Sequence, residues 1–442
     1  MAPHRDPDRD PDRDDLDVAV VGGGVAGLAA AHAARASGGR VRVFEAADHV
    51  GGRTSTLRVD GFLADTGAER LPERGYDATW SLLAELGIDR ADVPLIGRRV
   101  GMWRDGRVRP GVADALGLLT GAGLGLRARL DARRALGSGH DLDRPEDSGT
   151  ATVVEHLARY HRDVLEYLLQ PVVSGFFGWR PERSAAAPAL ALLGSAGAAS
   201  TWRVHPDGMD RLARALADRL DVRTSARVTE VVADRDGARL VVGGREVAAR
   251  RVVLAVPAPV ALDLHANPPE REAEFLRACT FTPVVKVHLL LDRPLPSAAH
   301  LVVVPRAESD VVSAIAFDHL RHPGRAPEGR GLLTVVANPV LAPRLARLPD
   351  ADVADMLTRA TGKFAPGLGE AVTGALVHRF RHGLPEATPR ALGLRAGFAA
   401  ALGSSTVDYA GDWVLLSPCS EAAVRTGLRA GARAVARRGE LV

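Results

Sequence analysis

A strand, a glycine-rich turn and a helix near the start of the chain constrain its fold more than any other feature. Residues 17–21 form a short apolar run, as expected of a buried parallel strand, and residues 28–36 are good helix formers. Between them, Gly22, Gly24 and Gly27 give the spacing G-x-G-x-x-G. In a chain with 46 glycines, this triplet becomes informative through its position between strand and helix.

The strand predicted next, at residues 40–44, ends on an acid, Glu45. A glycine triplet followed by such an acid is the fingerprint of a dinucleotide site. Gly22 permits the tight turn, Gly24 lets the backbone approach a pyrophosphate, and Gly27 allows close packing of helix on strand. Glu45 would accept hydrogen bonds from ribose hydroxyls. The sequence therefore predicts an α/β fold that opens with a dinucleotide-binding unit.

Length and charge narrow the class of protein further. At 442 residues the chain can form two or three domains, or two large interleaved ones. The net charge of +3 is small and arginines alternate with acids, so no nucleic-acid partner is predicted. Cys279 and Cys419 are the only cysteines. They support neither a disulfide framework nor a metal site, which favours a reducing cytoplasm. No oligomeric state is predicted.

Three segments bear on membranes and targeting. Residues 1–15 repeat Asp, Pro and Arg without an apolar core. They predict a disordered tail and are not typical of a signal peptide. Residues 113–126 and 187–200 are apolar and glycine-rich, but too short for a spanning helix. Buried helix is favoured for both, and membrane contact is at most peripheral.

The segment after Glu45 carries a resemblance to a known family. Gly51, Gly52 and Arg53, followed by Asp65 and Gly67, match a pattern shared by the flavin amine oxidase superfamily. That superfamily includes monoamine oxidases, protoporphyrinogen oxidases and carotenoid desaturases. The resemblance extends from about residue 16 to residue 438.

The resemblance implies FAD as the cofactor and assigns residues to it. Arg53 would neutralise the pyrophosphate, Asp412 would contact the ribityl and phosphate region, and the backbone of Val228 would meet the adenine. Ser417, followed by Pro418, predicts the N-cap of a closing helix whose positive end would face the flavin. The full set of implied cofactor-binding residues is Gly22, Gly24, Gly27, Glu45, Gly52, Arg53, Gly67, Val228, Gly411, Asp412 and Ala423.

The same resemblance implies two interleaved domains. A doubly wound, Rossmann-type FAD domain would comprise residues 16–75, 201–261 and 381–442. An α+β substrate domain would comprise residues 76–200 and 262–380.

Several stretches resemble protoporphyrinogen oxidases in particular. In one of them Arg99 falls where an arginine holds a substrate carboxylate, and a solvated surface role is the alternative. The C-terminal segment around Asp412 and Trp413 is closer to desaturases. Cys419 stands where amine oxidases place a tyrosine of an aromatic cage, which disfavours amine oxidation.

Lys286 is unusual in this chain, because only two of its 57 basic residues are lysines. It lies in the predicted strand at residues 281–292. The matching strand of amine oxidases carries a lysine that reaches flavin N5 through a water. We interpret Lys286 as a catalytic residue that needs a compact ammonium. A solvated strand face is the alternative. Lys363 lies in a loop and gets no functional interpretation.

The resemblance implies an FAD-dependent oxidoreductase, an oxidase, dehydrogenase or desaturase. It would transfer hydride from a substrate C–H bond to flavin N5, with protoporphyrinogen oxidase-like or desaturase-like chemistry and a small apolar or polycyclic substrate. The alternatives are an amine oxidase and a flavin monooxygenase. A non-enzymatic relative, like the Rab GDP-dissociation inhibitors, is disfavoured by intact Glu45, Arg53 and Asp412. No metal site is predicted.

Overall fold

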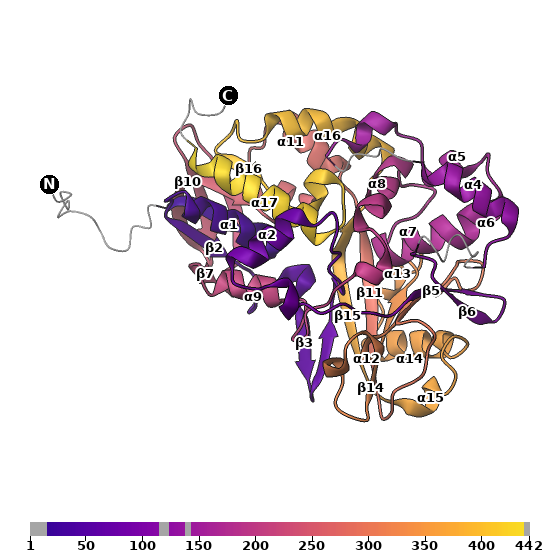
Figure 1. Cartoon of the computed structure of the whole chain (residues 1–442). Coiled ribbons are helices and arrows are strands. Elements are labelled where there is room, and N and C mark those ends of the chain that lie inside the picture. Colours follow the sequence, from indigo (N-terminus) through magenta and orange to yellow (C-terminus); the bar gives the residue numbers. More distant parts are fainter. Residues whose placement is uncertain (1–15, 115–122, 138–142, 437–442) are drawn as a thin grey trace.

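The computed structural model describes residues 16–114, 123–137 and 143–436 (Figure 1). The tail predicted at residues 1–15 and most of the apolar segment 113–126 therefore lie outside the described residues. Among the described helices, none combines the length and the apolar character needed to cross a membrane.

The first sheet is built around the N-terminal strand β1. Its strand order is β7-β2-β1-β10-β9-β8, and β16 pairs with β10 on a branch. The strands β7, β2, β1, β10 and β16 run parallel, whereas β8, β9 and β10 form an antiparallel meander. The bounds are β1 (Leu16–Val21), β2 (Val41–Phe44), β7 (Val222–Arg223), β8 (Val228–Ala233), β9 (Ala238–Val242), β10 (Arg245–Leu254) and β16 (Val407–Tyr409).

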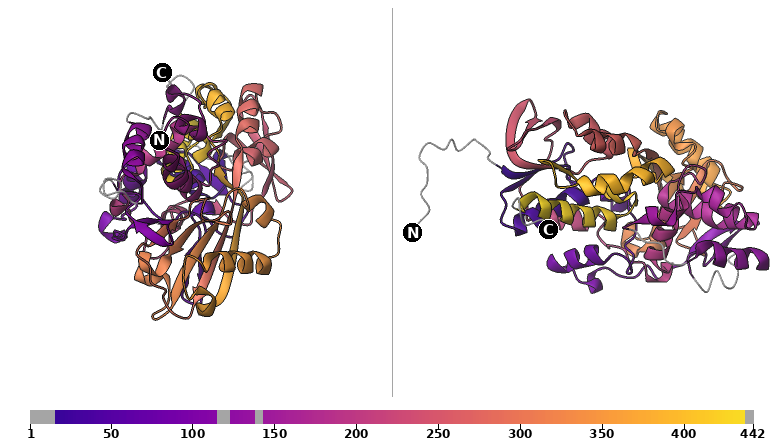
Figure 2. Two further views of the ribbon diagram at one scale, coloured as in Figure 1. Left: turned by 90° about the vertical axis from the view of Figure 1, so that its right-hand side faces the viewer. Right: turned by 90° about the horizontal axis from the view of Figure 1, so that it is seen from above.

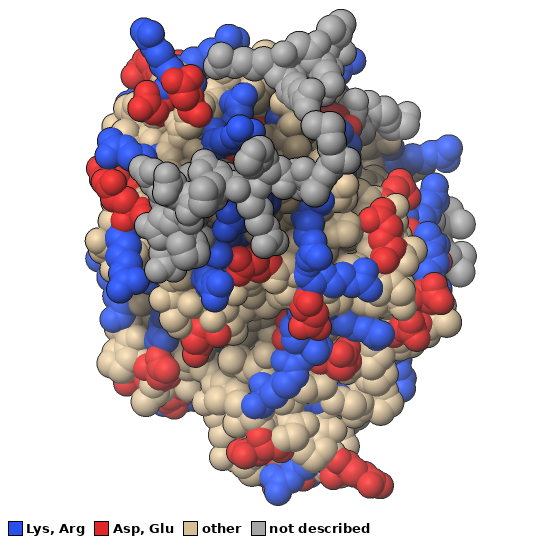
Figure 3. Space-filling view, turned by 90° about the vertical axis from the view of Figure 1, so that its left-hand side faces the viewer, with Lys and Arg blue, Asp and Glu red and all other residues tan. Residues whose placement is uncertain are grey.

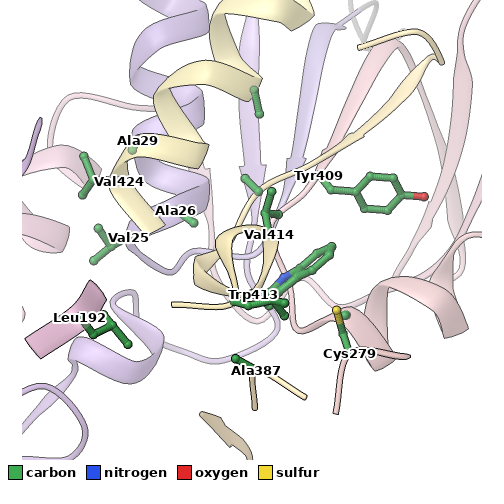
Figure 4. Packing of buried hydrophobic residues seen from close by; sticks show 14 of the residues in the cluster. Val25, Ala26, Ala29, Leu192, Cys279, Ala387, Tyr409, Trp413, Val414 and Val424 are labelled. Carbon is green, nitrogen blue, oxygen red and sulfur yellow. The ribbon is translucent and has the colours of Figure 1, made fainter. Parts of the chain in front are cut away.

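Two helices from opposite ends of the chain pack together beside this sheet. They are α1 (Val25–Ala36) and α17 (Ser420–Val435). Their backbones come close because two residues of α17 lack side chains. A Cβ at Gly427 or Gly431 would lie 2.2 or 2.1 Å from a carbonyl oxygen of α1. Figure 4 shows side chains of both helices in the resulting core.

The second sheet has the order β15-β11-β14-β13-β12-β5-β6 and is antiparallel except where β12 pairs with β5. Its bounds are β5 (Val100–Arg104), β6 (Arg107–Pro110), β11 (Phe281–Leu291), β12 (Leu301–Val303), β13 (Val312–Phe317), β14 (Gly331–Ala337) and β15 (Val372–Pro385). A separate hairpin joins β3 (Thr56–Val59) to β4 (Phe62–Asp65).

The two sheets confirm the predicted fold class, a Rossmann-type unit interleaved with an α+β unit. The chain passes between the two units several times, which Figure 2 shows as neighbouring segments of distant colours. β15 runs through the expected boundary between residues 380 and 381. The domain boundaries themselves stay a prediction.

The remaining helices cover the sheets, and several of them lie within residues 76–200 of the expected substrate domain. α8 spans residues 186–196 and is buried from Ala186 to Leu192, as expected for the first part of the segment 187–200. The bounds are α2 (Asp77–Glu85), α4 (Leu126–Leu136), α5 (Val153–Leu157), α6 (Arg162–Val164), α7 (Gln170–Phe177), α8 (Ala186–Ala196), α9 (Arg211–Ala217), α10 (Ala258–Leu264), α11 (Glu270–Ala278), α12 (Asp318–Arg321), α13 (Ala342–Leu345), α14 (Asp350–Thr361), α15 (Leu368–Ala371) and α16 (Pro389–Ala401).

Charged side chains of both signs are interspersed on the face shown in Figure 3. Neither sign forms a continuous field on the part of that face that the described residues make up. Such a surface lacks the basic stripe that nucleic-acid binding requires, and the absence of a nucleic-acid partner stays a prediction.

Candidate active site

A cavity of about 840 Å³ begins at the turn between β1 and α1 and extends to β11 of the second sheet. Gly22 takes a φ of +110°, and Gly24 is the N-cap of α1. A Cβ at Gly24 would meet no atom within 4 Å, so this side of the turn faces open space. The first N–H groups of a helix lack partners within the helix and attract anions. The turn thus offers a place for phosphate.

Gly27 and Val228 do not line the cavity. A Cβ at Gly27 would lie 1.9 Å from the carbonyl oxygen of Gly22. Glycine at this position therefore allows α1 to pack closely against the turn. Val228 is buried at the start of β8. The structure brings the other nine predicted cofactor residues to the cavity wall: Gly22, Gly24, Glu45, Gly52, Arg53, Gly67, Gly411, Asp412 and Ala423.

Glu45 follows directly on β2 and is held by the backbone. One carboxylate oxygen accepts a hydrogen bond of 2.5 Å from the Gly23 N–H, and the other accepts one of 2.7 Å from the Ala47 N–H. These bonds fix the side chain in one orientation beside the glycine turn. An oriented carboxylate at this place suits a vicinal diol such as that of a ribose.

Arg53 and Asp412 form a two-fold ion pair. Both terminal nitrogens of Arg53 donate to Asp412 oxygens at 2.7 Å, and one also donates to the Gly383 carbonyl at 2.9 Å. The sequence predicted separate contacts of these residues with a cofactor. In the structure they bind each other and join the N- and C-terminal segments at the cavity wall, and their contacts with a cofactor stay a prediction.

Lys286 lies on β11 with its side chain 8% exposed. Its ammonium donates to the Gly67 carbonyl at 2.7 Å and to a carboxylate oxygen of Glu69 at 2.5 Å. All three residues line the cavity. Lys286 therefore does not lie on a solvated strand face. The catalytic role stays a prediction.

Glu69 was not identified from the sequence as a site residue. Burial disfavours its charged form, but the charges of Lys286, Arg321 and Arg70 outweigh burial and lower the pKa of Glu69 to about 2. The Glu69 carboxyl group is thus ionised at neutral pH. Only its position two residues after Gly67 could have indicated Glu69.

A second group of buried charged side chains contacts the backbone at Glu69. Asp65 accepts hydrogen bonds from Arg321 at 2.9 Å and from Arg325 at 2.7 Å. Arg321 also donates to the Glu69 carbonyl at 2.7 Å and pairs with Asp318 at 2.7 Å. These four charged side chains are nearly inaccessible to water, and their charges balance. Pairs of this kind hold their backbone rigidly, because separating them exposes a buried charge.

Much of the cavity wall is apolar, and we call this part of the cavity the apolar chamber. Its walls carry the side chains of Val112, Leu136, Leu168, Leu169, Val172, Phe176, Phe177, Leu192, Leu193, Trp202, Val284, Leu301, Val336, Phe380 and Leu384. The guanidinium of Arg70 also faces this chamber, 4.4 Å from the ring centre of Phe176 and 5.0 Å from that of Trp202. Stacking on aromatic rings holds an arginine in place while its N–H edge stays available.

Arg99 is not brought to this chamber. Its side chain is exposed and it is not among the residues that line the cavity. Its carbonyl accepts a hydrogen bond of 3.1 Å from the His300 N–H beside β5. Arg70, unlike Arg99, lines the cavity and stacks on two aromatic rings of its wall; Arg53, Arg379 and Arg381 line the cavity as well.

The closing helix begins later than predicted. α17 starts at Ser420 with Cys419 as its N-cap, so the N-cap assigned to Ser417 was wrong. The chain first completes a 3-10 turn that ends at Leu416 in a left-handed conformation (φ 49°). The helix N-terminus still borders the cavity through Pro418, Cys419 and Ser420.

Comparison with known proteins agrees with this geometry. The pattern that defines the family described as flavin containing amine oxidoreductases matches residues 25–435. The coproporphyrinogen III oxidase of Propionibacterium freudenreichii subsp. freudenreichii is 45% identical over 92 residues, 21% of this chain and 17% of that protein. The mitochondrial protoporphyrinogen oxidase of Nicotiana tabacum is 29% identical over 168 residues, 37% of this chain and 33% of that protein.

The chain thus spans a third or less of the length of these curated relatives in the matched regions. A solved putrescine oxidase with putrescine bound superposes over 96% of this chain and 99% of its own, with a TM-score of 0.75 and 22% identity. At that identity the likeness shows a shared fold.

Proposed function

Because the chain belongs to the flavin-containing amine oxidoreductases, we propose that it binds FAD in this cavity and oxidises an apolar, carboxylated small molecule. The reaction class is that of the protoporphyrinogen oxidases or the desaturases. When bound, the flavin supplies an acceptor for a hydride taken from a substrate C–H bond.

FAD fits the donor set better than a mononucleotide would. The open space at Gly24 beside the start of α1 suits a pyrophosphate, and the fixed carboxylate of Glu45 suits the ribose diol of an adenosine. The loop at residues 67–70 and Lys286 would border the flavin ring. Arg53 would offer positive charge to the phosphates while it stays paired with Asp412.

Lys286 would position a water or a proton beside the reacting atoms. An ammonium has three N–H donors. Two of them bind Gly67 and Glu69, and the third has no protein partner among the described residues. Glu69 fixes the ammonium in place and balances its charge. The remaining N–H is then available on the cavity side.

The observation that carries the substrate class is the position of Arg70 on two aromatic rings within an apolar chamber. Such a guanidinium can bind a carboxylate in pairs of hydrogen bonds while the rest of the substrate packs on apolar walls. Glu69 and Asp412, two of the four carboxylates that line the cavity, are already paired with protein cations, which leaves these two poorly suited to bind a substrate ammonium. The porphyrinogen oxidases among the relatives agree with this class.

Amine oxidation is the second candidate, because a putrescine oxidase shares the fold. A flavin monooxygenase is the third. Neither explains an arginine at the apolar wall.

Substituting the two candidate arginines tests the assignment of Arg70. Loss of a charge-assisted hydrogen bond should raise the Kd of Arg70→Met for a carboxylated porphyrinogen analogue about 10- to 100-fold. The matched Arg99→Met should bind like wild type. Binding is measured by perturbation of the flavin absorbance. Equal Kd values for wild type and Arg70→Met would remove Arg70 from the substrate site.

A further inference from the structure

Helix α4 exposes its large apolar side chains and buries its small ones. Among the described residues, the exposed large hydrophobic side chains are Leu95, Leu126, Leu130 and Val340. Two of these four lie one turn apart on α4, with Leu126 76% and Leu130 61% exposed. The residues that α4 buries are three alanines, Ala128, Ala132 and Ala135. A helix that only supported the core would be expected to turn its leucines inward.

The exposed residues of α4 also share one side of the helix. At 3.6 residues per turn, positions 126, 127, 130, 133 and 134 fall within an arc of about 120°, opposite the alanines. Besides the two leucines, this arc carries Arg127, Arg133 and Arg134, and all three arginines are exposed. The outer face of α4 is thus both apolar and basic. We call these five residues the α4 face.

The one acid of α4, Asp131, lies beside this arc. Its side chain is 14% exposed, pairs with Arg134 at 3.4 Å and accepts a hydrogen bond from the His161 N–H. Of the three exposed arginines of the α4 face, only Arg134 has an acidic partner among the described residues. A second copy of the chain docked on the same face would bring arginines together, which disfavours self-association. An anionic partner with an apolar layer matches both kinds of side chain.

We propose that the α4 face docks the protein onto an anionic lipid surface. Leu126 and Leu130 enter the interface between headgroups and acyl chains, and the arginines bind the lipid phosphates. Figure 1 places α4 beside α5 and α6, at the end of the molecule opposite the first sheet. Leu136, the last residue of the same helix, lines the apolar chamber. Docking therefore holds one wall of that chamber close to a layer in which apolar molecules dissolve. The proposal does not depend on the proposed function.

Co-sedimentation of the purified full-length protein with lipid vesicles tests this assignment. The protein should bind vesicles of phosphatidylcholine mixed with phosphatidylglycerol, and should bind phosphatidylcholine alone far more weakly. Leu126→Ser/Leu130→Ser should lower the partition coefficient at least about tenfold, because each leucine loses its burial in the interface. The matched pair Leu95→Ser/Val340→Ser removes the other exposed apolar side chains and should bind like wild type.

The charge contribution is tested separately. Arg127→Gln/Arg133→Gln should weaken binding roughly fivefold per arginine at low salt, and added salt should weaken wild type in the same way. Arg245→Gln/Arg250→Gln, exposed on the first sheet, is the control. Circular dichroism verifies that each variant is folded. Wild type that ignores anionic vesicles, or α4 variants that bind like wild type, would overturn the proposal. A self-association that Leu126→Ser/Leu130→Ser abolishes, without vesicle binding, would assign the face to a contact between copies.

Discussion

At the scale of single residues, a substitution at Gly24 should abolish cofactor binding without affecting folding. Its φ of −73° is ordinary for any residue, and a Cβ there would meet no atom within 4 Å. Gly24→Val should therefore fold normally but place its side chain where a pyrophosphate would lie. We expect wild type to release about one FAD per chain on denaturation and Gly24→Val to release almost none. The measurement is chromatography and mass of the released cofactor.

The chain offers a matched control for this change. Gly125 is also a helix N-cap in extended conformation, with a φ of −68° and open space around its Cβ. Gly125→Val should retain its flavin. Full flavin in Gly24→Val, or FMN in place of FAD in wild type, would contradict the assigned site.

Lys286 and Glu69 should depend on each other for stability. Lys286→Met leaves the Glu69 carboxylate buried without its partner, which typically costs about 3–5 kcal/mol of unfolding free energy. Lys286→Met/Glu69→Gln removes both charges and should recover most of that loss. Lys363 and Glu308 form the comparable exposed pair, with Lys363 54% exposed, and Lys363→Met should cost at most about 1 kcal/mol. Urea titrations measure all four proteins. Equal losses of unfolding free energy in Lys286→Met and Lys363→Met would show that the buried pair contributes no more to stability than the exposed pair.

The functional part of the Lys286 hypothesis needs a different measurement. After photoreduction, stopped-flow reoxidation by oxygen should be slower in Lys286→Met/Glu69→Gln than in wild type. Lys286→Arg should restore little, because a planar guanidinium does not fit between the Gly67 carbonyl and Glu69 as a compact ammonium does. Unchanged oxygen rates would leave Lys286 with a structural role alone.

At the scale of elements, Glu421 of α17 caps the start of α2. The N-cap of α2, Tyr76, offers no capping side chain. Glu421 instead accepts hydrogen bonds from the N–H groups of Ala78 and Thr79 and from the Thr79 hydroxyl, at 2.7 to 3.0 Å. Glu421→Ala should therefore cost roughly 2–4 kcal/mol of unfolding free energy and speed amide hydrogen exchange at the start of α2.

The local capping box of α5 provides the comparison for Glu421. There Glu155 and Thr152 cap each other within one exposed turn, so Glu155→Ala should cost only about 1 kcal/mol. If Glu421→Ala lost no more stability than Glu155→Ala, the contact between α2 and α17 would not matter for stability.

Features whose residues lie close together in the sequence could be predicted, whereas contacts between distant segments could not. The turn at Gly22 and the acid at Glu45 lie within one strand-helix-strand unit, so their spacing and their position in that unit predicted the fold and a dinucleotide site. Lys286 stood out because lysine is rare in this chain. Its partner Glu69 lies 217 positions away, and no local pattern relates the two.

Long-range contacts also explain why the sequence indicated Arg99 and not Arg70. Arg70 stacks on Phe176 and Trp202, which the fold brings from later segments, and no local pattern in the sequence shows these contacts. The start of α17 was predicted too early because Ser417-Pro418 is a good local helix start. In the structure the N–H groups of Leu416 and Ser417 instead bind the carbonyls of Trp413 and Asp412 in the preceding 3-10 turn, so the helix begins after this turn.

At the scale of the whole molecule, buried histidines should make stability depend on pH. Burial, as the largest cause, lowers the pKa of His205 and His265 to about 4 and that of His288 and His300 to about 3. The unfolded chain binds these protons near pH 6.5, whereas the folded chain does not. Stability is therefore complete above about pH 6.5 and is lost as the pH falls toward 4 and 3.

One substitution isolates this effect. His288→Gln should narrow the difference in unfolding free energy between pH 7 and pH 5 by about 2 kcal/mol, because one proton fewer is taken up on unfolding. His49, whose side chain is 61% exposed, provides the control, and His49→Gln should leave the difference unchanged. The measurement is urea unfolding at both pH values. An identical pH difference in His288→Gln and wild type would be inconsistent with a neutral buried imidazole.

The central claim is that one cavity holds FAD and an apolar, carboxylated substrate from which hydride is taken. Anaerobic mixing of the purified flavoprotein with two groups of reductants tests it most directly, with flavin absorbance as the signal. The first group is carboxylated porphyrinogens and the second is primary and secondary amines, including putrescine. We expect bleaching by a member of the first group, weakened in Arg70→Met, and none by the amines. Rapid bleaching by an amine, with the porphyrinogens inert, would contradict the claim and assign the chain to amine oxidation.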